Sequence, residues 1–427
     1  MAKNRVVITG LGIVSSLGNT LDEFWSELIN GKSGIGYISK FNADNFQCRI
    51  AGEVHNFQLS DYGMSKRLAH KIDDFTKYAL ATTEMCIKNS QIILENVCTH
   101  DVGIFVGNCL GGVGFGEKEL YNLYKSGSKA VSPYQAISWF YAAPQGQISI
   151  YYNIKGYSKT YVADRISSDI AFGSAYEALE LKRAKYIFVC GTEGQMQPYG
   201  YLGFTQSNTM TSENRLDSYR PYDLTRKGLV MGEGSGTLLL EDLEAALERN
   251  APIYAEVIGY ASTCDGVHNS KSDETGEGLK RAISLCIERA GISKEEIDYI
   301  NLDGAGSQKD DFIEQKVLKE FFGEVIGNIA MSAPKASYGN TFGASGAMDM
   351  IVNCMAIKTG IVPPTINYKN KDDECSLNCT FNKSVKKDIN VVLQIARGRG
   401  GVNSAILVRK YEKQNKDNIG GDRVGEL

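Results

Sequence analysis

The chain has little of what several common enzyme classes require. Its 427 residues include four histidines, and none is paired with another ligand at the spacing of a metal site. We therefore expect neither a metal nor a cofactor. FGASGAM at 342–348 loosely resembles a nucleophile elbow, but no histidine follows His268. The order serine, acid, histidine of the α/β-hydrolases is thereby excluded.

Long apolar runs and an excess of basic charge are also missing. The N-terminal MAKNRVVITGLGIVSSLG contains one short apolar run, too short for a secretory signal. No stretch approaches the roughly 20 apolar residues that cross a membrane. The net charge of -4 offers no basic surplus for nucleic acid or an anionic membrane. We expect a cytoplasmic protein that binds neither nucleic acid nor membranes.

Phosphate-binding loops are incomplete in this sequence. GLGIVS follows the strand-like RVVITG and has two glycines of the dinucleotide fingerprint without the third. There is no Walker A sequence. We interpret GLGIVS as a tight turn.

What the chain does have is the composition of a globular protein with a sizeable core. It is 43% hydrophobic and 22% charged. Most of its ten cysteines lie in apolar runs, for example Cys190, Cys286 and Cys354. In a chain of this length we expect reduced core thiols rather than disulfides.

Strand-like and helix-like segments alternate along the chain, which predicts an α/β fold. GEGSGTLLLED at 232–242 is echoed by GRGGVNSAILVRK at 398–410, and SSDIAFGSAYEAL by NTFGASGAMDMIVNCMAI. These echoes indicate an internal duplication, with halves at 1–253 and 254–411. The small residues of the second pair place those helices in the middle of a layered fold. Residues 412–427 are polar and lack a period, which predicts a mobile tail.

One helix of the second half can be delimited from its pattern. GLKRAISLCIERAG places Leu279, Ile283 and Cys286 on one face, and Gly291 is positioned to cap its C-terminus. Ser293 to Glu296 then has the pattern of a capping box.

The segment YVADRISSDIAFGSAYEALELKRAK, from Tyr161 to Lys185, raises a chemical question. A short extended stretch gives way to a helix, and Asp164 and Arg165 lie at the corner between them. Such corners often present a nucleophile to a cleft. An arginine instead opposes the helix dipole, at a cost of roughly 0.3–1 kcal/mol.

Several motifs together resemble the β-ketoacyl synthase branch of the thiolase-like superfamily. They are VVITGLGIVSSLGNTLDEFWSELINGKSGI, RPYDLTRKGLVMGEGSGTLLLEDLEAALERNAPIYAEVIGYAST, PKASYGNTFGASGA and VPPTINY, in that order. The resemblance extends to about residue 411. It implies an internally duplicated, five-layered α-β-α-β-α fold.

Active members of this family carry an acylated cysteine and two histidines. By the motifs, the cysteine position falls on Arg165, the first histidine on Asp303 and the second on Asn340. Lys335 of the last motif is retained. A guanidinium stays protonated and cannot replace a thiolate, so the resemblance implies no independent activity. We expect Arg165 and Asp303 to form an ion pair that fills the vestigial pocket. The alternative is that Arg165 reaches only solvent, Asp164 or Asp169.

One sub-branch has lost the nucleophile: the type II polyketide chain-length factor, or ketosynthase β-subunit, in which glutamine usually replaces the cysteine. GGVGFGEKELYNLYKSG, SPYQAISWFYAAPQGQISI, NLDGAG and ARGRGGVNSAILVRK resemble this branch. Arg397 and Arg399 replace phenylalanines of the active enzymes' gate loop. The resemblance implies a heterodimer with a catalytic ketosynthase α-subunit, served by an acyl carrier protein that carries the malonyl unit or polyketide chain. The lysine, asparagine, isoleucine and tyrosine content indicates a low-GC source, for which an anthraquinone-type octaketide system is a hypothesis.

In that branch an interface tunnel sets the length of the poly-β-ketone, and the resemblance places its gate on GGVGFGEKEL. Val113, Gly116 and Leu120 share one helix face, and Phe115 should lie off it. Small residues at the first two positions predict a roomy passage, closed further along by Tyr199 or Trp139. Core packing is the alternative interpretation for those two aromatics.

The sequence thus predicts a non-catalytic subunit of a β-ketoacyl synthase complex for aromatic polyketides. Two alternatives remain open. One is a catalytically competent β-ketoacyl-[acyl-carrier-protein] synthase that uses another nucleophile, for which Cys109 and Cys264 are available. The other is a partner subunit of a polyene or fatty-acyl synthase.

Overall fold

The computed structural model describes residues 4–412 apart from 208, 269–271 and 376. The predicted tail at 412–427 lies, from residue 413 onward, outside the described residues. Within the described part of the chain, no helix combines the length and apolar character that crossing a membrane requires.

Ten strands form one hydrogen-bonded series that consists of two halves of five strands with the same plan. In each half two antiparallel pairings are followed by two parallel ones. The halves meet where β1 pairs with β8 over three residues. The first half runs β1 (Val6–Val14), β7 (Gly234–Asp242), β6 (Tyr186–Glu193), β4 (Val102–Gly107) and β5 (Lys159–Tyr161). The second runs β8 (Ala255–Cys264), β14 (Val402–Arg409), β13 (Val391–Arg397), β9 (Tyr299–Asn301) and β10 (Ala330–Ser332).

This plan confirms the internal duplication. The echoed segments 232–242 and 398–410 supply β7 and β14, which occupy equivalent places in the two halves. The echoed small-residue segments supply α7 (Ser167–Glu180) and α13 (Ser345–Thr359), which contact each other.

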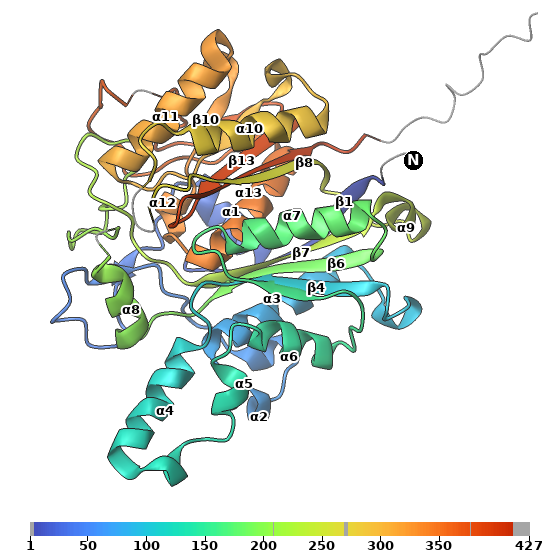
Figure 1. The fold of residues 1–427 in the computed structure, drawn as a ribbon, viewed down its shortest axis with the longest axis vertical. Coiled ribbons are helices and arrows are strands. Elements are labelled where there is room, and N and C mark those ends of the chain that lie inside the picture. Colours follow the sequence, from blue (N-terminus) through green and yellow to red (C-terminus); the bar gives the residue numbers. More distant parts are fainter. Residues whose placement is uncertain (1–3, 208, 269–271, 376, 413–427) are drawn as a thin grey trace, which may run out of the picture.

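The layers follow the order α-β-α-β-α (Figure 1). Helix α3 (Asp74–Ser90) covers the outer face of the first half, α7 and α13 lie between the halves, and α10 (Glu277–Ala290) with α11 (Gln308–Phe322) covers the second. Three buried apolar clusters fill the spaces between these layers. The remaining helices are α1 (Leu21–Ile29), α2 (Lys66–Ala69), α4 (Val113–Ser126), α5 (Gln135–Ser138), α6 (Ala143–Tyr151), α8 (Pro198–Thr205), α9 (Leu243–Glu248) and α12 (Lys335–Tyr338), and the short strands are β2 (Gly36–Tyr37), β3 (Ile50–Ala51), β11 (Ile361–Val362) and β12 (Val385–Lys386).

The tight turn predicted at GLGIVS is wrong, because β1 continues through it to Val14. The ladder with β7 shifts register between Ile8 and Gly10, so the strand accommodates the glycines as an irregularity. Gly10 and Gly12 lie against α3, and a Cβ at either would run into the backbone of that helix. These glycines therefore permit close helix–strand packing.

The helix face, the C-cap and the capping box predicted in the second half are confirmed. Gly291 caps α10 in the left-handed conformation, with a φ of 66°. Leu279, Ile283 and Cys286 are buried on the face that packs against the sheet. The capping box between Ser293 and Glu296 is present.

Close packing of the middle layer depends on small residues. In α7, the Cα of Gly173 lies against the ring of Tyr260 from β8, and a Cβ at this position would overlap the ring atoms. In α13, the amide of Ala347 donates to Ser168 Oγ of α7 at 3.0 Å. The middle layer therefore has no room for additional methyl groups.

We predict that Gly173→Ala lowers the free energy of unfolding by about 1–3 kcal/mol, because the added methyl overpacks the core. Gly146→Ala in α6 is the matched control, since a Cβ there meets no atom within 4 Å. This control should instead gain about 0.5–1 kcal/mol from reduced backbone entropy. Urea unfolding of both variants measures the difference, and equal shifts would contradict the packing argument.

Candidate functional site

The corner between β5 and α7 has the backbone of a sharp turn. Asp164 takes a left-handed conformation with a φ of 52°, which aspartate tolerates better than most residues. Ser167 Oγ accepts from the amide of Ala163 at 2.8 Å and donates to the carbonyl of Asp164 at 2.7 Å. Arg165 therefore projects from a fixed position at the start of α7.

Arg165 is buried, with 9% of its surface exposed, and contacts two carboxylates. Its Nη1 lies 3.9 Å from Asp303 Oδ2, and its Nε lies 3.7 Å from Asp164 Oδ2. The expected contact with Asp303 is confirmed, and the alternative partner Asp164 is engaged as well. Burial alone would lower the pKa of Arg165, but the charges of Asp303 and Asp164 outweigh it and raise that pKa. The guanidinium is therefore permanently charged.

Asp303 reaches the corner from the loop after β9. Its backbone amide donates to Glu314 of α11 at 2.7 Å, and the amide of Gly304 donates to the same carboxylate at 3.1 Å. Burial and the charge of Asp303 raise the pKa of Glu314 to about 7. The loop is thus fixed from behind while its carboxylate faces Arg165.

Asn340 follows α12 and is fully buried. Its Oδ1 accepts from the amide of Phe342 at 3.0 Å. A carboxamide neither takes up nor releases a proton in the pH range of an imidazole, so Asn340 cannot serve as an acid or base.

Lys335 forms a second buried ion pair close to Asp303. Its Nζ lies 2.5 Å from Asp349 Oδ2 and donates to the carbonyl of Leu302 at 3.1 Å. Tyr338 donates to the other oxygen of Asp349 at 2.7 Å. Burial would lower the pKa of Lys335, but Asp349 and Asp303 raise it overall. Lys335 is therefore a fixed cation between carboxylates.

Arg397 and Arg399 bring two more cations to this region. Arg397, buried at the end of β13, has its Nη2 3.9 Å from Asp265 Oδ2. The backbone amide of Arg399 donates to Asp164 Oδ2 at 2.7 Å, and its Nη2 donates to the carbonyl of Ser207 at 2.8 Å. The glycine-rich loop after β13 is therefore bonded to the Arg165 corner.

Asp265 and Asp310 are members of this network that the sequence motifs did not single out. Burial would raise the pKa of Asp310, but Arg165 and its serine partners lower it overall. No motif marks either carboxylate, because both reach the site only through folding. The resulting network, which we call the ionic network, comprises Arg165, Lys335, Arg397, Arg399, Asp164, Asp265, Asp303, Asp310 and Asp349.

The two cysteines that could serve as alternative nucleophiles, Cys109 and Cys264, lie in different surroundings. Cys109 Sγ lies 3.9 Å from Asp164 Oδ1, and burial, with the charges of Glu193 and Asp164, raises its pKa well above the usual range. Cys264 is exposed and contacts the carbonyl of Gly400. Among the described residues, no group of three or more His, Cys, Asp or Glu side chains could hold a metal ion.

The residues expected at the gate gather around a separate cavity of about 560 Å³ beside α4. Phe115 does not line it. Trp139 and Tyr199 are 47% and 67% exposed, so core packing is the wrong interpretation for them in this chain. The cavity is lined by Val113, Gly116, Leu120, Trp139 and Tyr199 together with Leu110, Glu117, Glu119, Leu123, Val131, Gln135 and Tyr141.

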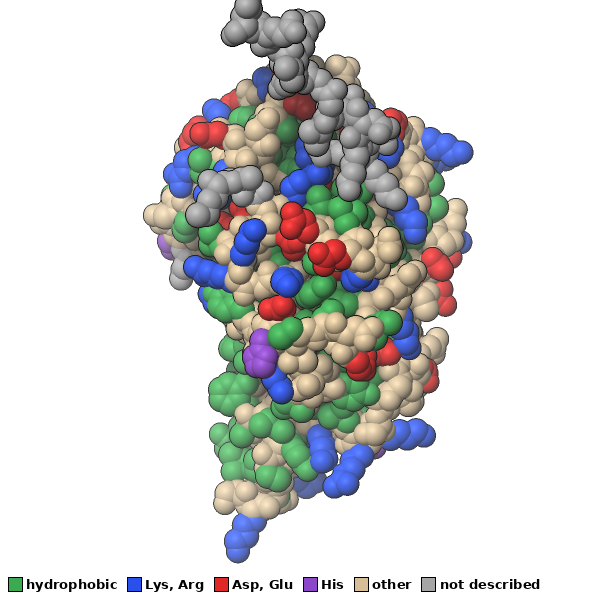
Figure 2. Space-filling view, turned by 90° about the vertical axis from the view of Figure 1, so that its right-hand side faces the viewer, with side chains coloured by type: hydrophobic (Ala, Val, Ile, Leu, Met, Phe, Trp, Pro, Cys, Tyr) green, Lys and Arg blue, Asp and Glu red, His purple; other side chains and the backbone are tan. Residues whose placement is uncertain are grey.

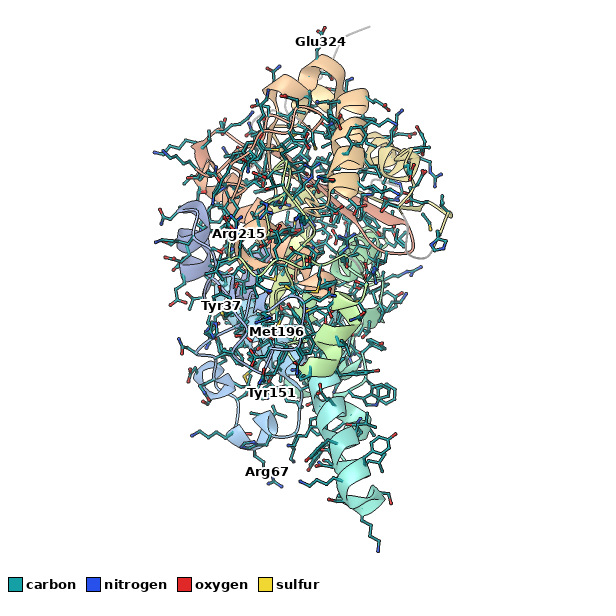
Figure 3. The ribbon with its side chains drawn as sticks, turned by 90° about the vertical axis from the view of Figure 1, so that its left-hand side faces the viewer. Tyr37, Arg67, Tyr151, Met196, Arg215 and Glu324 are labelled. Atoms are coloured by element: carbon teal, nitrogen blue, oxygen red, sulfur yellow. The ribbon has the colours of Figure 1, made fainter. Side chains whose placement is uncertain are left out.

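The helix beside this cavity projects from the body of the molecule (Figures 1 and 3). Hydrophobic side chains gather on the lower part of the surface (Figure 2). Those exposed on α4 to α6 and near the cavity are Leu120, Tyr121, Leu123, Tyr124, Ile137, Trp139, Phe140, Tyr141, Ile150, Tyr151 and Tyr199. We call this set the apolar face. Exposed apolar side chains that gather in this way are typical of interaction sites and of ligand-binding grooves.

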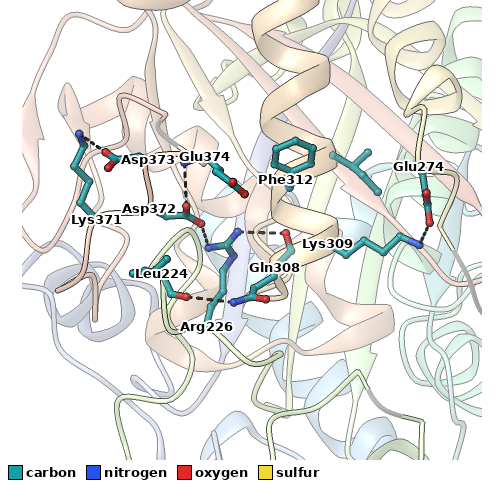
Figure 4. Close-up of a pocket in the computed structure, with 11 residues that line it drawn as sticks. Leu224, Arg226, Glu274, Gln308, Lys309, Phe312, Lys371, Asp372, Asp373 and Glu374 are labelled. Atoms are coloured by element: carbon teal, nitrogen blue, oxygen red, sulfur yellow. Dashed lines mark hydrogen bonds and ion pairs between the residues drawn. The ribbon is translucent and has the colours of Figure 1, made fainter.

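A cavity of about 870 Å³ lies elsewhere, between the start of α11 and residues 371–374 (Figure 4). Most of its charged side chains form ion pairs. Arg226 lies 2.6 Å from Asp372 and 3.2 Å from Asp311, Lys309 lies 2.8 Å from Glu274, and Lys371 lies 2.7 Å from Asp373. These pairs connect the loops around the cavity.

Comparison with known proteins agrees with this architecture. The sequence matches "Beta-ketoacyl synthase, N-terminal domain" over residues 3–246 and "Beta-ketoacyl synthase, C-terminal domain" over residues 254–369. Among curated relatives, the 3-oxoacyl-[acyl-carrier-protein] synthase 2 of Synechocystis sp. is 33% identical over 96% of this chain and 99% of its own. The 3-oxoacyl-[acyl-carrier-protein] synthase 2 of Coxiella burnetii is 32% identical over 96% of this chain and 99% of its own length.

Two solved structures are similar over 96% of this chain and 100% of their own. One is the ishigamide ketosynthase/chain length factor, with a TM-score of 0.89 and 27% identity. The other is a type II polyketide synthase acyl carrier protein in complex with its ketosynthase bound to the hexaketide, with a TM-score of 0.88 and 25% identity. With both domains matched in order on a duplicated, layered α/β fold, the chain belongs to the β-ketoacyl synthase family.

Proposed function

We propose that this protein is a non-catalytic chain-length factor that pairs with a catalytic ketosynthase. The observation that carries the proposal is Arg165, a buried cation held between Asp303 and Asp164. The sequence motifs place the family's acylated cysteine at this position. Condensation needs a nucleophile that accepts the acyl chain and groups that stabilise the enolate. The protonated guanidinium of Arg165 cannot accept the acyl chain as a thiolate does, and Asp303 and Asn340 stand where the motifs place the two imidazoles.

The contribution that remains is shape. A reactive poly-β-ketone must be kept from water and premature cyclisation, which requires a narrow and largely apolar passage. The cavity beside α4 has apolar walls in Val113, Leu120 and Trp139, and it opens beside the apolar face. We infer that a ketosynthase α-subunit covers this face and that the passage runs between the two subunits.

The apolar character of this face favours an obligate partner. Interfaces of that class bury roughly 2,000–5,000 Å² and are more hydrophobic than transient ones. We infer that an acyl carrier protein delivers the malonyl unit to the partner subunit, where the cysteine resides. The product class that we propose is an aromatic polyketide.

A catalytic 3-oxoacyl-[acyl-carrier-protein] synthase is the second candidate, favoured by the names of the curated relatives at 32–33% identity. Its difficulty is the ionic network, which occupies the place of the reacting groups. A partner subunit of a polyene or fatty-acyl synthase is compatible with the same geometry, and product analysis separates it from the aromatic pathway.

We predict that the purified chain, incubated with acetyl- and malonyl-carrier protein, gains no acyl adduct in intact-mass spectrometry. A catalytic ketosynthase of the same family, treated in parallel, is the positive control. An adduct on this chain, or condensation by this chain without a second subunit, would overturn the proposed function in favour of the catalytic alternative.

We predict that Arg165→Cys does not create a reactive site. The carboxylates of Asp164, Asp303 and Asp310 surround that position and should hold the thiol pKa above its usual value of about 8.5. The rate of alkylation against pH measures the pKa. Combining Arg165→Cys with Asp303→His and Asn340→His should lower the pKa of the introduced thiol. A thiolate at neutral pH in the Arg165→Cys variant would refute the electrostatic argument.

We predict that Gly116→Phe shortens the products made with the partner ketosynthase by at least one extender unit. A Cβ on Gly116 first meets Gln135 and Trp139 at 3.7 and 3.8 Å, so a larger side chain enters the cavity. Product masses measure the length. Phe115→Leu is the matched control because Phe115 does not line the cavity. If an intact complex that contains Gly116→Phe makes products of unchanged length, the assignment of Gly116 to the gate is wrong.

A further inference from the structure

The helix that forms one wall of the cavity has almost no apolar anchorage of its own. Among the residues of α4, all of which the structure describes, only Glu119 is buried. The apolar side chains Leu120, Tyr121 and Tyr124 are exposed. Gly112 begins the helix without a capping side chain. Some other group must therefore fix where this helix begins.

That group is the carboxylate of Asp73, which bridges two helices. Its Oδ2 accepts from the amide of Phe115 in the first turn of α4 at 2.6 Å. Its Oδ1 accepts from the amide of Phe75 in the first turn of α3 at 3.3 Å. Both amides belong to the unpaired donors of a helix N-terminus, where a negative charge is favoured. Asp73 is 4% exposed, so water does not compete for these bonds.

The anchor at the other end of this bridge is rigid. Helix α3 packs against β1, β6 and β7, and Phe75 and Tyr78 are buried. Burial and the charge of Asp74 raise the pKa of Asp73 to about 7, while the amides of Phe115 and Phe75 oppose that rise. The carboxylate is thus held at an energetic cost that an ordinary surface cap does not incur.

The opposite wall of the cavity is tied to the same segment of chain. Ser138 Oγ of α5 donates to the carbonyl of Lys71 at 2.5 Å. The next residue, Trp139, lines the cavity and accepts from the amide of Gly112 at 3.0 Å through its carbonyl. Residues 71–73 therefore hold both α4 and α5.

We propose that Asp73 is a positioning residue that sets the separation of α4 from α5 and thereby the length of chain that the passage accepts. This inference rests on the proposed function and adds a specificity determinant outside the cavity wall. Asp73 touches no cavity atom and acts through the backbone of Phe115. A role confined to capping α3 would need only one of its two oxygens, and serine could supply that one.

The test uses two substitutions in the complex with the partner ketosynthase. Asp73→Ser keeps an N-cap for α3, but the serine side chain is too short to reach the amides of both Phe75 and Phe115. Asp73→Asn replaces one carboxylate oxygen with an NH₂ group, which cannot accept a hydrogen bond from a backbone amide. Asp74→Asn is the matched control, because its carboxylate pairs with Lys77 at 2.7 Å on the surface of the same helix. Hydrogen exchange of the α4 amides at about pH 8, where Asp73 is ionised, is measured beside the product masses.

We expect both Asp73 variants to speed exchange in the first turn of α4 at least about tenfold, since a hydrogen bond to a charged group is lost. Their products should spread over more lengths than those of the native complex. Asp74→Asn should change neither readout.

Unchanged exchange in both Asp73 variants would overturn the inference, and so would faster exchange with unchanged product lengths. A failure of the proposed function can be distinguished from a failure of this inference. If Gly116→Phe leaves the products unchanged, the passage is misassigned, whereas the exchange measurement still reports whether Asp73 holds α4.

Discussion

The structure of the corner between β5 and α7 depends on one constraint, a buried guanidinium that cannot lose its proton. Arg165 lies at a helix N-terminus, where both burial and the helix dipole disfavour a cation. Carboxylates must therefore accompany it, and Asp303 and Asp164 do so. Asp164 is in turn bonded to the amide of Arg399, so the corner and the glycine-rich loop form one unit. The position of the Arg165 side chain is therefore fixed by several charged groups together rather than by a single partner.

The shape of the duplicated scaffold does not depend on the ionic network. The two halves, with α7 and α13 packed between them, are stabilised by buried apolar clusters that contain none of its charged residues. The site residues occupy loops at the ends of strands and helices, where substitution does not disturb those clusters. Under the proposed function, such a scaffold offers a partner surface and a passage without a nucleophile of its own.

Much of the fold could be predicted, because it depends on local patterns and ordered motifs. The echoed segments gave the duplication, and the positions of Arg165 and Asp303 within two motifs were sufficient to predict their contact. The turn at GLGIVS was wrong because Gly10 and Gly12 serve packing against α3, a tertiary demand that the local pattern does not reveal. Asp73 was missed for a related reason. Its significance depends on the amide of Phe115, which lies 42 residues away in the chain. The roles of the gate residues remain predictions.

A helix held by carboxylate–amide bonds suits an interface better than one held by apolar packing. If Leu120, Tyr121 and Tyr124 anchored α4 to its own chain, they could not contribute to contact with a partner. Asp73 fixes the backbone from one end and leaves the apolar face unoccupied. A helix already fixed in position loses less conformational freedom when a partner covers it, so more of the burial energy contributes to association. Under the proposed function, the bridge that positions α4 also leaves the apolar side chains of this helix available to a partner.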